Sequence, residues 1–321
     1  MTAGCTLPAR AIHLGSIAIL ALAACSTETS RWQIIDQIRA GARMEAGVVA
    51  LDRGRMLMLG GIKGQGEVTD EVLLYDLDAR AWSMRAPMPE RLHHLNAAVV
   101  GDRVFVVGAL LGLEFYPTEH VYSYDPARDT WDERKLAPTG LARGASGVVA
   151  MGDAIYVMGG SAPEPSERVS LYHVADDTWK SLPDLPAPAY HSVGASVDGV
   201  VYCVGGFVGP ASSPSTKVYA LGAGATQWIE RSSLRVPMGG CASGVYGAHI
   251  ICAGGEGERE MPYLQVVQIY DAAGDSWLLG ESLPMPVAAT NGAIMGQQFI
   301  VPGGLTTDPL HPNATVLAYS F

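Results

Sequence analysis

The sequence has few charged residues, and few of those are basic. Charged side chains make up 17% of the 321 residues, and 32 acidic residues outnumber 21 Lys and Arg, for a net charge of −11. A protein that neutralises nucleic-acid phosphates carries a basic stripe. No such stripe is present, so nucleic acid is excluded as the expected partner.

Long segments with helical periodicity are also missing. The chain instead contains 38 glycines and 20 prolines, which suits many turns. Its apolar residues fall in short runs rich in β-branched and aromatic side chains, bounded by Gly, Asp and Pro. Such runs are typical of strands joined by tight turns, so we expect an all-β fold.

Cysteine is scarce, with five residues, and no Cys/His cluster has the spacing of a zinc site. We therefore expect no metal and no cofactor. Cys203 and Cys252 are interpreted as small buried strand residues. The alternative for Cys241 is a disulfide with one of them in an oxidising compartment.

One unit, residues 147–183, shows how the whole chain is organised. It contains short apolar runs, a Gly-Gly step, a Tyr and a Trp, and reads as four strands. The step recurs every 46 to 51 residues, with a degraded copy at Gly108-Ala109, and a Tyr follows each copy. The steps begin at Gly60, Gly108, Gly159, Gly205, Gly254 and Gly303. The tyrosines are Tyr75, Tyr124, Tyr172, Tyr219, Tyr270 and Tyr319.

A period near 50 residues with Gly-Gly, Tyr and Trp resembles the kelch-repeat family. The resemblance covers about nine tenths of the chain in six copies in phase. It implies a six-bladed β-propeller over residues 31–321, with four antiparallel strands in each blade. The Gly-Gly steps are not phosphate loops, because no Lys-Ser/Thr pair follows them.

Trp32 predicts how the propeller closes. The last unit has its glycine step and Tyr319, but the sequence printed here stops at Phe321, before an outer strand. Trp32 precedes Gly60 by the same interval that separates Trp131 from Gly159. Residues 31–35 are therefore expected to supply the missing strand and complete the last blade, which leaves no unpaired inner edge. The alternative is that Trp32 is a stray aromatic in a linker.

The first 24 residues are predicted to be a signal peptide. A positive flank at Arg10 precedes an apolar stretch too short to span a bilayer comfortably. It ends in Leu22-Ala23-Ala24-Cys25, which resembles the bacterial lipobox, so Cys25 is the expected lipidation site and residues 25–30 a polar tether. Ser26 after the Cys favours the outer membrane, facing the periplasm or the surface. The alternative is an ordinary secretory signal with a chance Cys.

The central opening is the expected binding site. Its lining comes from the residues that lead into each innermost strand, together with the long loops after Gly-Gly. Fourteen residues before each glycine step stand Ala46, His94, Ala145, His191, Gly240 and Ala289. The candidate ligand-binding residues are His94, His191, Asn96, Asn291, Arg43, Arg91, Arg143, Tyr190 and Glu45.

Each candidate also has a structural alternative. The histidines can be hydrated rim residues, the asparagines can cap strand ends, and the arginines can form structural ion pairs. The acidic residues of the loops, including Glu256, are expected to be solvated. The repeated Tyr and Trp are expected to form core packing between blades.

Two functions remain open on the sequence. The first is a monomeric, lipid-anchored propeller that binds a protein, peptide or glycan at the cell envelope. The second is an isomerase, because the architecture is similar to that of the periplasmic N-acetylneuraminate epimerases (sialic acid mutarotases). Mutarotation needs an acid, a base and a cation for the substrate carboxylate. His94, His191, Glu45 and Arg143 supply those side-chain types, although the family's functional residues cannot be matched position by position.

Overall fold

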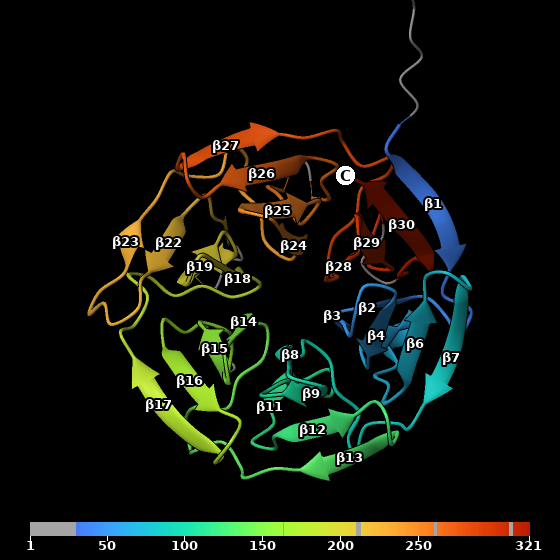
Figure 1. Ribbon diagram of the computed structural model, residues 1–321, viewed down its shortest axis with the longest axis horizontal. Helices are drawn as coiled ribbons and strands as arrows, with labels where there is room; N and C mark the ends of the chain where they lie inside the picture. The colour runs from blue at the N-terminus through green and yellow to red at the C-terminus, as the bar shows by residue number, and fades with distance from the viewer. Residues whose placement is uncertain (1–29, 163, 210–212, 260–261, 308–310) are drawn as a thin grey trace, which may run out of the picture. The chain divides into compact units, whose positions relative to one another are not determined.

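The computed structural model describes residues 30–321, except 163, 210–212, 260–261 and 308–310. Residues Arg31–Phe321 form one compact unit. In it, six four-stranded antiparallel sheets surround a common axis, as blades do in a propeller (Figure 1). The predicted six-bladed fold is confirmed. The predicted signal peptide and Cys25 lie outside the described residues.

The first three blades follow one another along the chain, each running from the axis outward. Blade 1 consists of β3 (Gly47–Ala50), β4 (Arg55–Leu59), β6 (Val72–Asp76) and β7 (Ala81–Arg85). Blade 2 consists of β8 (Ala97–Val100), β9 (Arg103–Val106), β12 (Tyr122–Asp125) and β13 (Thr130–Glu133). Blade 3 consists of β14 (Gly147–Met151), β15 (Ala154–Met158), β16 (Val169–His173) and β17 (Thr178–Leu182).

The next three blades complete the circle. Blade 4 consists of β18 (Val193–Val197), β19 (Val200–Val204), β22 (Val218–Leu221) and β23 (Ile229–Glu230). Blade 5 consists of β24 (Ala242–Tyr246), β25 (His249–Ala253), β26 (Val267–Asp271) and β27 (Ser276–Leu279). Blade 6 consists of β28 (Ala293–Met295), β29 (Gln298–Pro302), β30 (Thr315–Ser320) and the N-terminal β1 (Trp32–Gln37).

The N-terminal strand completes blade 6, as the position of Trp32 predicts. Strand β1 pairs antiparallel with β30, and Trp32 lies opposite Tyr319. The Trp32 indole N–H donates to the carbonyl of Glu281, just after blade 5, at 3.0 Å. Trp131 makes the equivalent bond, from blade 2 to Ala86 after blade 1, also at 3.0 Å. Blade 6, whose strands come from both ends of the propeller, therefore has the same geometry as the other blades.

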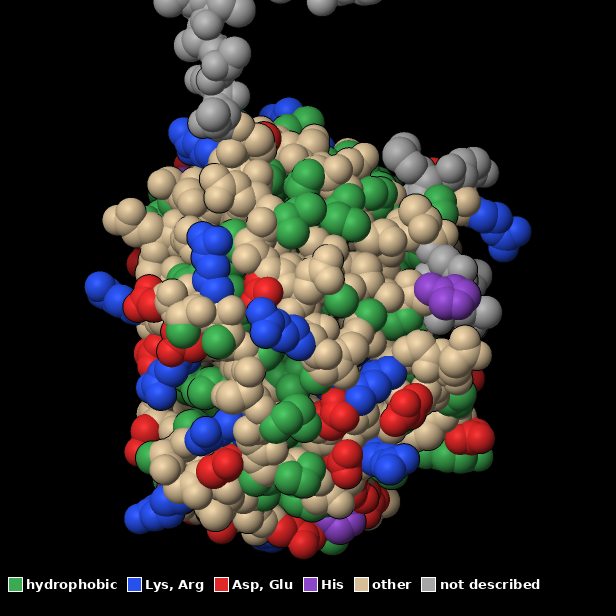
Figure 2. Space-filling view, turned by 90° about the vertical axis from the view of Figure 1, so that its right-hand side faces the viewer, with side chains coloured by type: hydrophobic (Ala, Val, Ile, Leu, Met, Phe, Trp, Pro, Cys, Tyr) green, Lys and Arg blue, Asp and Glu red, His purple; other side chains and the backbone are tan. Residues whose placement is uncertain are grey.

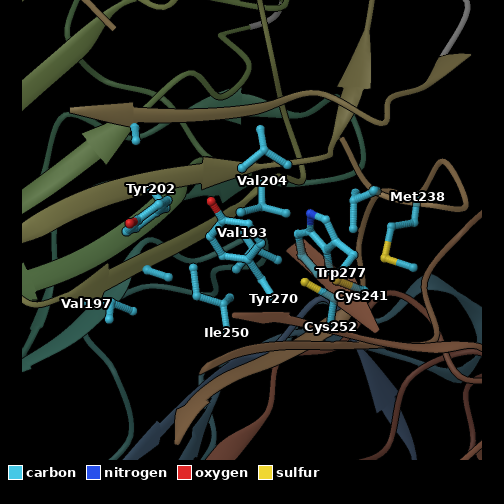
Figure 3. Close-up of a cluster of buried hydrophobic side chains, with 14 of the residues drawn as sticks. Val193, Val197, Tyr202, Val204, Met238, Cys241, Ile250, Cys252, Tyr270 and Trp277 are labelled. Carbon is cyan, nitrogen blue, oxygen red and sulfur yellow. The ribbon is translucent and has the colours of Figure 1, made fainter. Parts of the chain in front are cut away.

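The core lies between neighbouring blades. Figure 3 shows one such cluster, in which Tyr202 and Val204 of blade 4 pack near Tyr270 and Trp277 of blade 5. Alternating residues of each strand face one adjacent blade or the other, because successive side chains point to opposite sides of a strand. Each blade therefore buries both of its faces, which explains why the apolar runs are nearly continuous.

The glycine steps turn the chain at the end of each second strand. At Gly159-Gly160, both φ angles are positive, at 61° and 103°. A Cβ on Gly160 would lie 2.7 Å from the carbonyl oxygen of Gly144. Glycine is required at this step both for its φ and for the close approach of the backbone.

Short pairings gather the loops on one face of the propeller. The loop after each glycine step bonds to the segment that leads into the innermost strand of the same blade, as in the pairs His93–Leu110 and Tyr190–Phe207. We call this side the loop face. Its small strands are β2 (Arg43–Met44), β5 (Ile62–Lys63), β10 (Leu110–Leu111), β11 (Tyr116–Pro117), β20 (Phe207–Val208) and β21 (Ser213–Pro214), and one 3₁₀ turn, η1, covers Gly64–Gly66.

The side of the propeller seen in Figure 2 carries acidic and basic side chains interspersed. Ion pairs also join neighbouring blades, as in Arg134–Asp177 between blades 2 and 3 at 3.0 Å. Among the described residues, no helix has the length and apolar character that a membrane span requires.

Candidate functional site: the mouth of the central channel

A closed ring of backbone hydrogen bonds surrounds the axis on the loop face. One residue per blade donates its amide to the carbonyl of its counterpart in the preceding blade, with N···O distances of 2.7 to 3.0 Å. All six have left-handed φ angles, between 52° and 60°. We call these six residues the mouth ring: Glu45, His94, Ala145, His191, Gly240 and Ala289.

The mouth ring corrects one position of the sequence-based count. The fourteen-residue interval assigns Ala46 to blade 1, but the amide and carbonyl of Glu45 make the ring bonds. Blade 1 has one more residue between this position and Gly60 than the other blades have. The insertion places a carboxylate at the ring and leaves Ala46 buried.

Three of the six mouth-ring side chains converge. The Glu45 carboxylate lies 3.5 Å from Nε2 of His94 and 3.7 Å from Nδ1 of His191. A carboxylate oxygen of Glu45 and one ring nitrogen from each histidine all lie within 4.8 Å of one another. The side chains of Glu45, His94 and His191 are 16%, 6% and 13% exposed. The other three ring residues are Ala, Gly and Ala, which leaves room for the three polar groups to meet.

Aromatic side chains from the loop face enclose the two histidines. Phe115, from the β10–β11 hairpin, packs with its ring centre 5.3 Å from that of His94. Phe207, at the start of β20, lies 5.6 Å from His191, and Tyr190 lies 5.5 Å from it. These rings remove water from the cluster on its outer side.

Burial sets the protonation of the cluster. Loss of water raises the pKa of Glu45 to about 8 and lowers the pKa of His94 well below its usual value. The pKa of His191 is lowered by burial, and that of Glu256 is raised mainly by burial. At neutral pH the two imidazoles are therefore neutral, and Glu45 is largely protonated in the absence of a bound cation.

His93, which the sequence candidates omit, orients His94. His93 Nε2 lies 2.6 Å from the carbonyl oxygen of Gly112, which can only accept, so Nε2 of a neutral His93 carries the proton. His93 Nδ1 then accepts from Nδ1–H of His94. This chain leaves the lone pair of His94 on Nε2, the atom that faces Glu45.

A cavity of about 460 Å³ lies behind the mouth ring, along the axis. Its size is within the range of small-ligand pockets. The innermost strands of blades 1 to 5 and the segment that leads into β28 line it with small side chains, together with the hydroxyls of Ser146, Ser192, Ser243 and Thr290. The cluster of Glu45, His94 and His191 thus stands at one end of a polar channel.

Comparisons with known proteins agree with the repeat. The kelch motif matches residues 142–186. The chain is 30% identical over 273 residues to Kelch-like protein terF of Aspergillus terreus, covering 79% of this chain and 60% of that protein. It is 30% identical over 182 residues to Kelch-like protein 35 of Mus musculus, covering 56% of this chain and 30% of that protein.

These matches support the kelch-repeat family. The chain spans 60% of the length of the first of these relatives and 30% of the second. A third, Kelch-like protein 15 of Danio rerio, is 25% identical over 272 residues, covering 76% of this chain and 44% of that protein. All three relatives come from a fungus or an animal.

Two of the candidate arginines are used inside the propeller. The Arg143 guanidinium is buried and donates to the carbonyls of Gly159, Leu141 and Val157 at 2.5, 2.8 and 2.9 Å. Arg43 is equally buried and pairs with Glu71 at 2.8 Å. Both side chains therefore support the glycine steps and do not line the central cavity.

Arg91 is exposed on the connection into blade 2 and is not among the residues that line the cavity. The two asparagines join neighbouring blades. Buried Asn96 donates to the Arg143 carbonyl at 2.8 Å, and Asn291 donates to the Ala46 carbonyl at 3.1 Å. Asn291 lines the central cavity, whereas Asn96 is buried away from it.

Tyr190, the remaining candidate, is half-buried against His191.

Proposed function

We propose that this kelch propeller binds a protein partner through its loop face, and that a segment of the partner reaches into the mouth. The kelch repeat and the Kelch-like relatives favour protein binding as the class of function. The central cavity supplies a concave site on a rigid frame. Fold alone does not define the partner, so the surface around the mouth carries the argument.

The observation that carries the proposal is an apolar tip on the β10–β11 hairpin. Leu113, Phe115 and Tyr116 are 53%, 40% and 64% exposed, within four consecutive residues. The tip lies beside the mouth, because the Phe115 ring packs 5.0 Å from that of His93. Exposed aromatic residues next to a pocket are the usual anchors of protein interfaces.

The charge on the loops of the loop face indicates the chemistry of the partner. Exposed acidic residues stand on the loops of four blades, at Glu67, Glu114, Glu164 and Glu258. Complementary charge favours a partner with basic residues. We therefore propose a partner segment with an apolar anchor flanked by Lys or Arg.

The test is to select binding peptides from a random library with the purified chain and measure their affinity. Selected peptides should be basic with an apolar residue, and substitution of Phe115→Ser and Tyr116→Ser should weaken binding by about 30-fold or more. The matched control is Ile34→Ser, which removes an apolar side chain that is 63% exposed on the outer strand β1. Equal affinities of the wild type, the two tip variants and the Ile34→Ser control, or a failure to select any peptide, would contradict the proposal.

We also propose that Cys25 carries a lipid that holds the propeller at the outer membrane of a bacterial envelope. The support is the sequence pattern that ends at Cys25 and the polar residues that follow it. Metabolic labelling with a radioactive fatty acid should mark the full chain and should be lost in Cys25→Ser but retained in Cys5→Ser. Retention of label in Cys25→Ser would overturn the assignment.

Binding is proposed in preference to the mutarotase alternative because of Arg143. That alternative needs a cation for the substrate carboxylate, and the Arg143 guanidinium is engaged with backbone carbonyls inside blade 3. NMR of freshly dissolved α-sialic acid tests this choice directly. We expect the rate of mutarotation in the presence of the protein to equal the rate in buffer alone.

A further inference from the structure

We propose that Glu45, His94 and His191 bind a divalent transition-metal ion at the mouth of the channel. The three residues come from blades 1, 2 and 4 and occupy the same structural position in each. Two imidazole nitrogens and one carboxylate are a donor set that suits zinc and other first-row ions better than magnesium or calcium. The inference goes beyond partner binding and does not depend on it.

The distances fit ligands around one ion. Zinc binds imidazole nitrogen and carboxylate oxygen at about 2.0 to 2.2 Å, so two tetrahedral ligand atoms lie about 3.4 Å apart. The two separations from Glu45 are 3.5 and 3.7 Å. Both exceed a normal hydrogen bond. The contacts of Glu45 Oε2 with His94 and of Glu45 Oε1 with His191 need to close by only a few tenths of an ångström to share an ion. The ligand atoms of His94 and His191 lie within 4.8 Å of each other and would close by up to about 1.4 Å.

The orientation of His94 is that of a metal ligand. Ligating histidines commonly donate their second ring N–H to a fixed acceptor, which sets the tautomer and the ring plane. His94 donates Nδ1–H to His93, which is itself held by the Gly112 carbonyl. The lone pair on Nε2 is thereby directed toward the Glu45 carboxylate.

The frame holds the ligands before the ion arrives. The backbone of each ligand is tied into the mouth ring by two hydrogen bonds, one through its amide and one through its carbonyl. Each ligand residue keeps a left-handed φ of 52° or 53° that non-glycine residues seldom adopt. A site built on rigid positions loses little entropy on binding.

Three protein ligands leave coordination positions open toward the cavity. In zinc proteins, three ligands plus an open position are typical of sites that bind water or substrate, whereas structural sites have four protein ligands. The Ser146 hydroxyl already donates to the Gly159 carbonyl at 3.2 Å. The Ser192 hydroxyl lines the cavity and accepts from the Cys203 thiol at 3.4 Å, so its own proton can be donated to a bound water or an anionic group. Such a group is the class of ligand that the site would take.

The experiment titrates Zn²⁺ into the chelator-treated full chain by calorimetry and records the visible spectrum with Co²⁺. We expect one equivalent of Zn²⁺ and d–d bands from bound Co²⁺. Glu45→Gln, His94→Ala and His191→Ala should each weaken Zn²⁺ binding by about 100-fold or more, and His93→Ala by about 10- to 100-fold. The matched control, His120→Ala, removes a histidine that pairs with Glu133 away from the mouth and should bind as the wild type does.

Circular dichroism of each metal-free variant checks that the fold is kept, and Glu45→Gln, the most conservative change, keeps the test valid if a histidine variant unfolds. Absence of Zn²⁺ heat and of Co²⁺ bands in the wild type would overturn the inference. The same affinity in Glu45→Gln as in the wild type would also overturn it. Peptide binding measured in the presence of chelator separates this result from the proposed function.

Discussion

Trp32 and Tyr319, from opposite ends of the chain, face each other across the β1–β30 pair with their ring centres 5.1 Å apart. Tyr124 and Trp131 of blade 2 pack in the same way, at 4.9 Å. The last blade is thus an ordinary blade made from two distant segments. Its outer strand ties the N-terminal end of the propeller to the C-terminal end through backbone pairing.

The first prediction concerns this closure. Trp32 is 5% exposed, contacts Phe299 and Tyr319, and donates to a backbone carbonyl. Trp32→Ala should lower the free energy of unfolding by about 3 to 5 kcal/mol, through the lost burial and the cavity that remains. Equilibrium unfolding in urea measures this change in the free energy of unfolding. Ile34→Ala, at an exposed position of the same strand, should change stability by less than about 0.5 kcal/mol. Equal effects of the two substitutions would contradict the closure.

The second prediction concerns the pH dependence of the Arg43–Glu71 pair. Burial alone would raise the pKa of Glu71, but the hydrogen bonds from Lys63 and Arg43 outweigh it, so the pKa is lowered overall. A carboxyl whose pKa is lowered by folding stabilises the protein above its unfolded pKa and loses that stabilisation as the pH falls through the folded pKa. Glu71→Gln should therefore lower the free energy of unfolding by about 2 kcal/mol at pH 7, and by less below about pH 4.

Unfolding measured at pH 7 and at pH 3.5 on both proteins tests this difference. Glu167→Gln, at an exposed loop position, is the control. A cost of Glu71→Gln that grows as the pH falls would show that the sign is wrong.

The third prediction separates the structural arginine from the exposed one. Arg143→Lys keeps the charge but loses most of the fixed hydrogen bonds to the carbonyls of Gly159, Val157 and Leu141. Because the substitution leaves buried carbonyls without a hydrogen-bond partner, we expect it to lower the free energy of unfolding by about 3 kcal/mol. Arg91→Lys should be nearly neutral in the same unfolding assay. A stable Arg143→Lys protein with impaired ligand binding would instead restore Arg143 as a contact residue.

The fourth prediction concerns the thiols. Cys203, Cys241 and Cys252 are free and buried. Burial raises the pKa of Cys203 to about 11, and the hydrogen-bonded Cys241 thiol together with burial raises that of Cys252 well above its usual value (Figure 3). Because thiolates are the reactive form, a Cys5→Ser/Cys25→Ser chain should not react with a thiol reagent when folded. It should show three thiols in denaturant, and fewer would indicate a disulfide.

The repeat made the fold predictable. Six copies in phase determine the number of blades and the order of their strands. The interval from Trp32 to Gly60 identifies the strand that closes the last blade. Each of these predictions depends only on the spacing of residues within one repeat. The ring position of blade 1 could not be placed by counting, since the one-residue insertion becomes visible only when the hydrogen bonds of Glu45 are seen.

The site was only partly predictable. Glu45, His94 and His191 were all candidates, but no spacing rule joins residues 49 and 97 positions apart, so no metal was expected. Their convergence depends on blade curvature and on the small residues at Ala145 and Gly240. The role of His93 could not be predicted because it depends on the Gly112 carbonyl, which a loop brings into reach.

The most direct test of the mouth as a functional site is anomalous diffraction at the zinc edge from crystals of the protein soaked in Zn²⁺. The account predicts a peak about 2.1 Å from the Glu45 carboxylate and from a ring nitrogen of each of His94 and His191. A map with no peak at the mouth ring, or with zinc bound only at surface residues elsewhere, would contradict it.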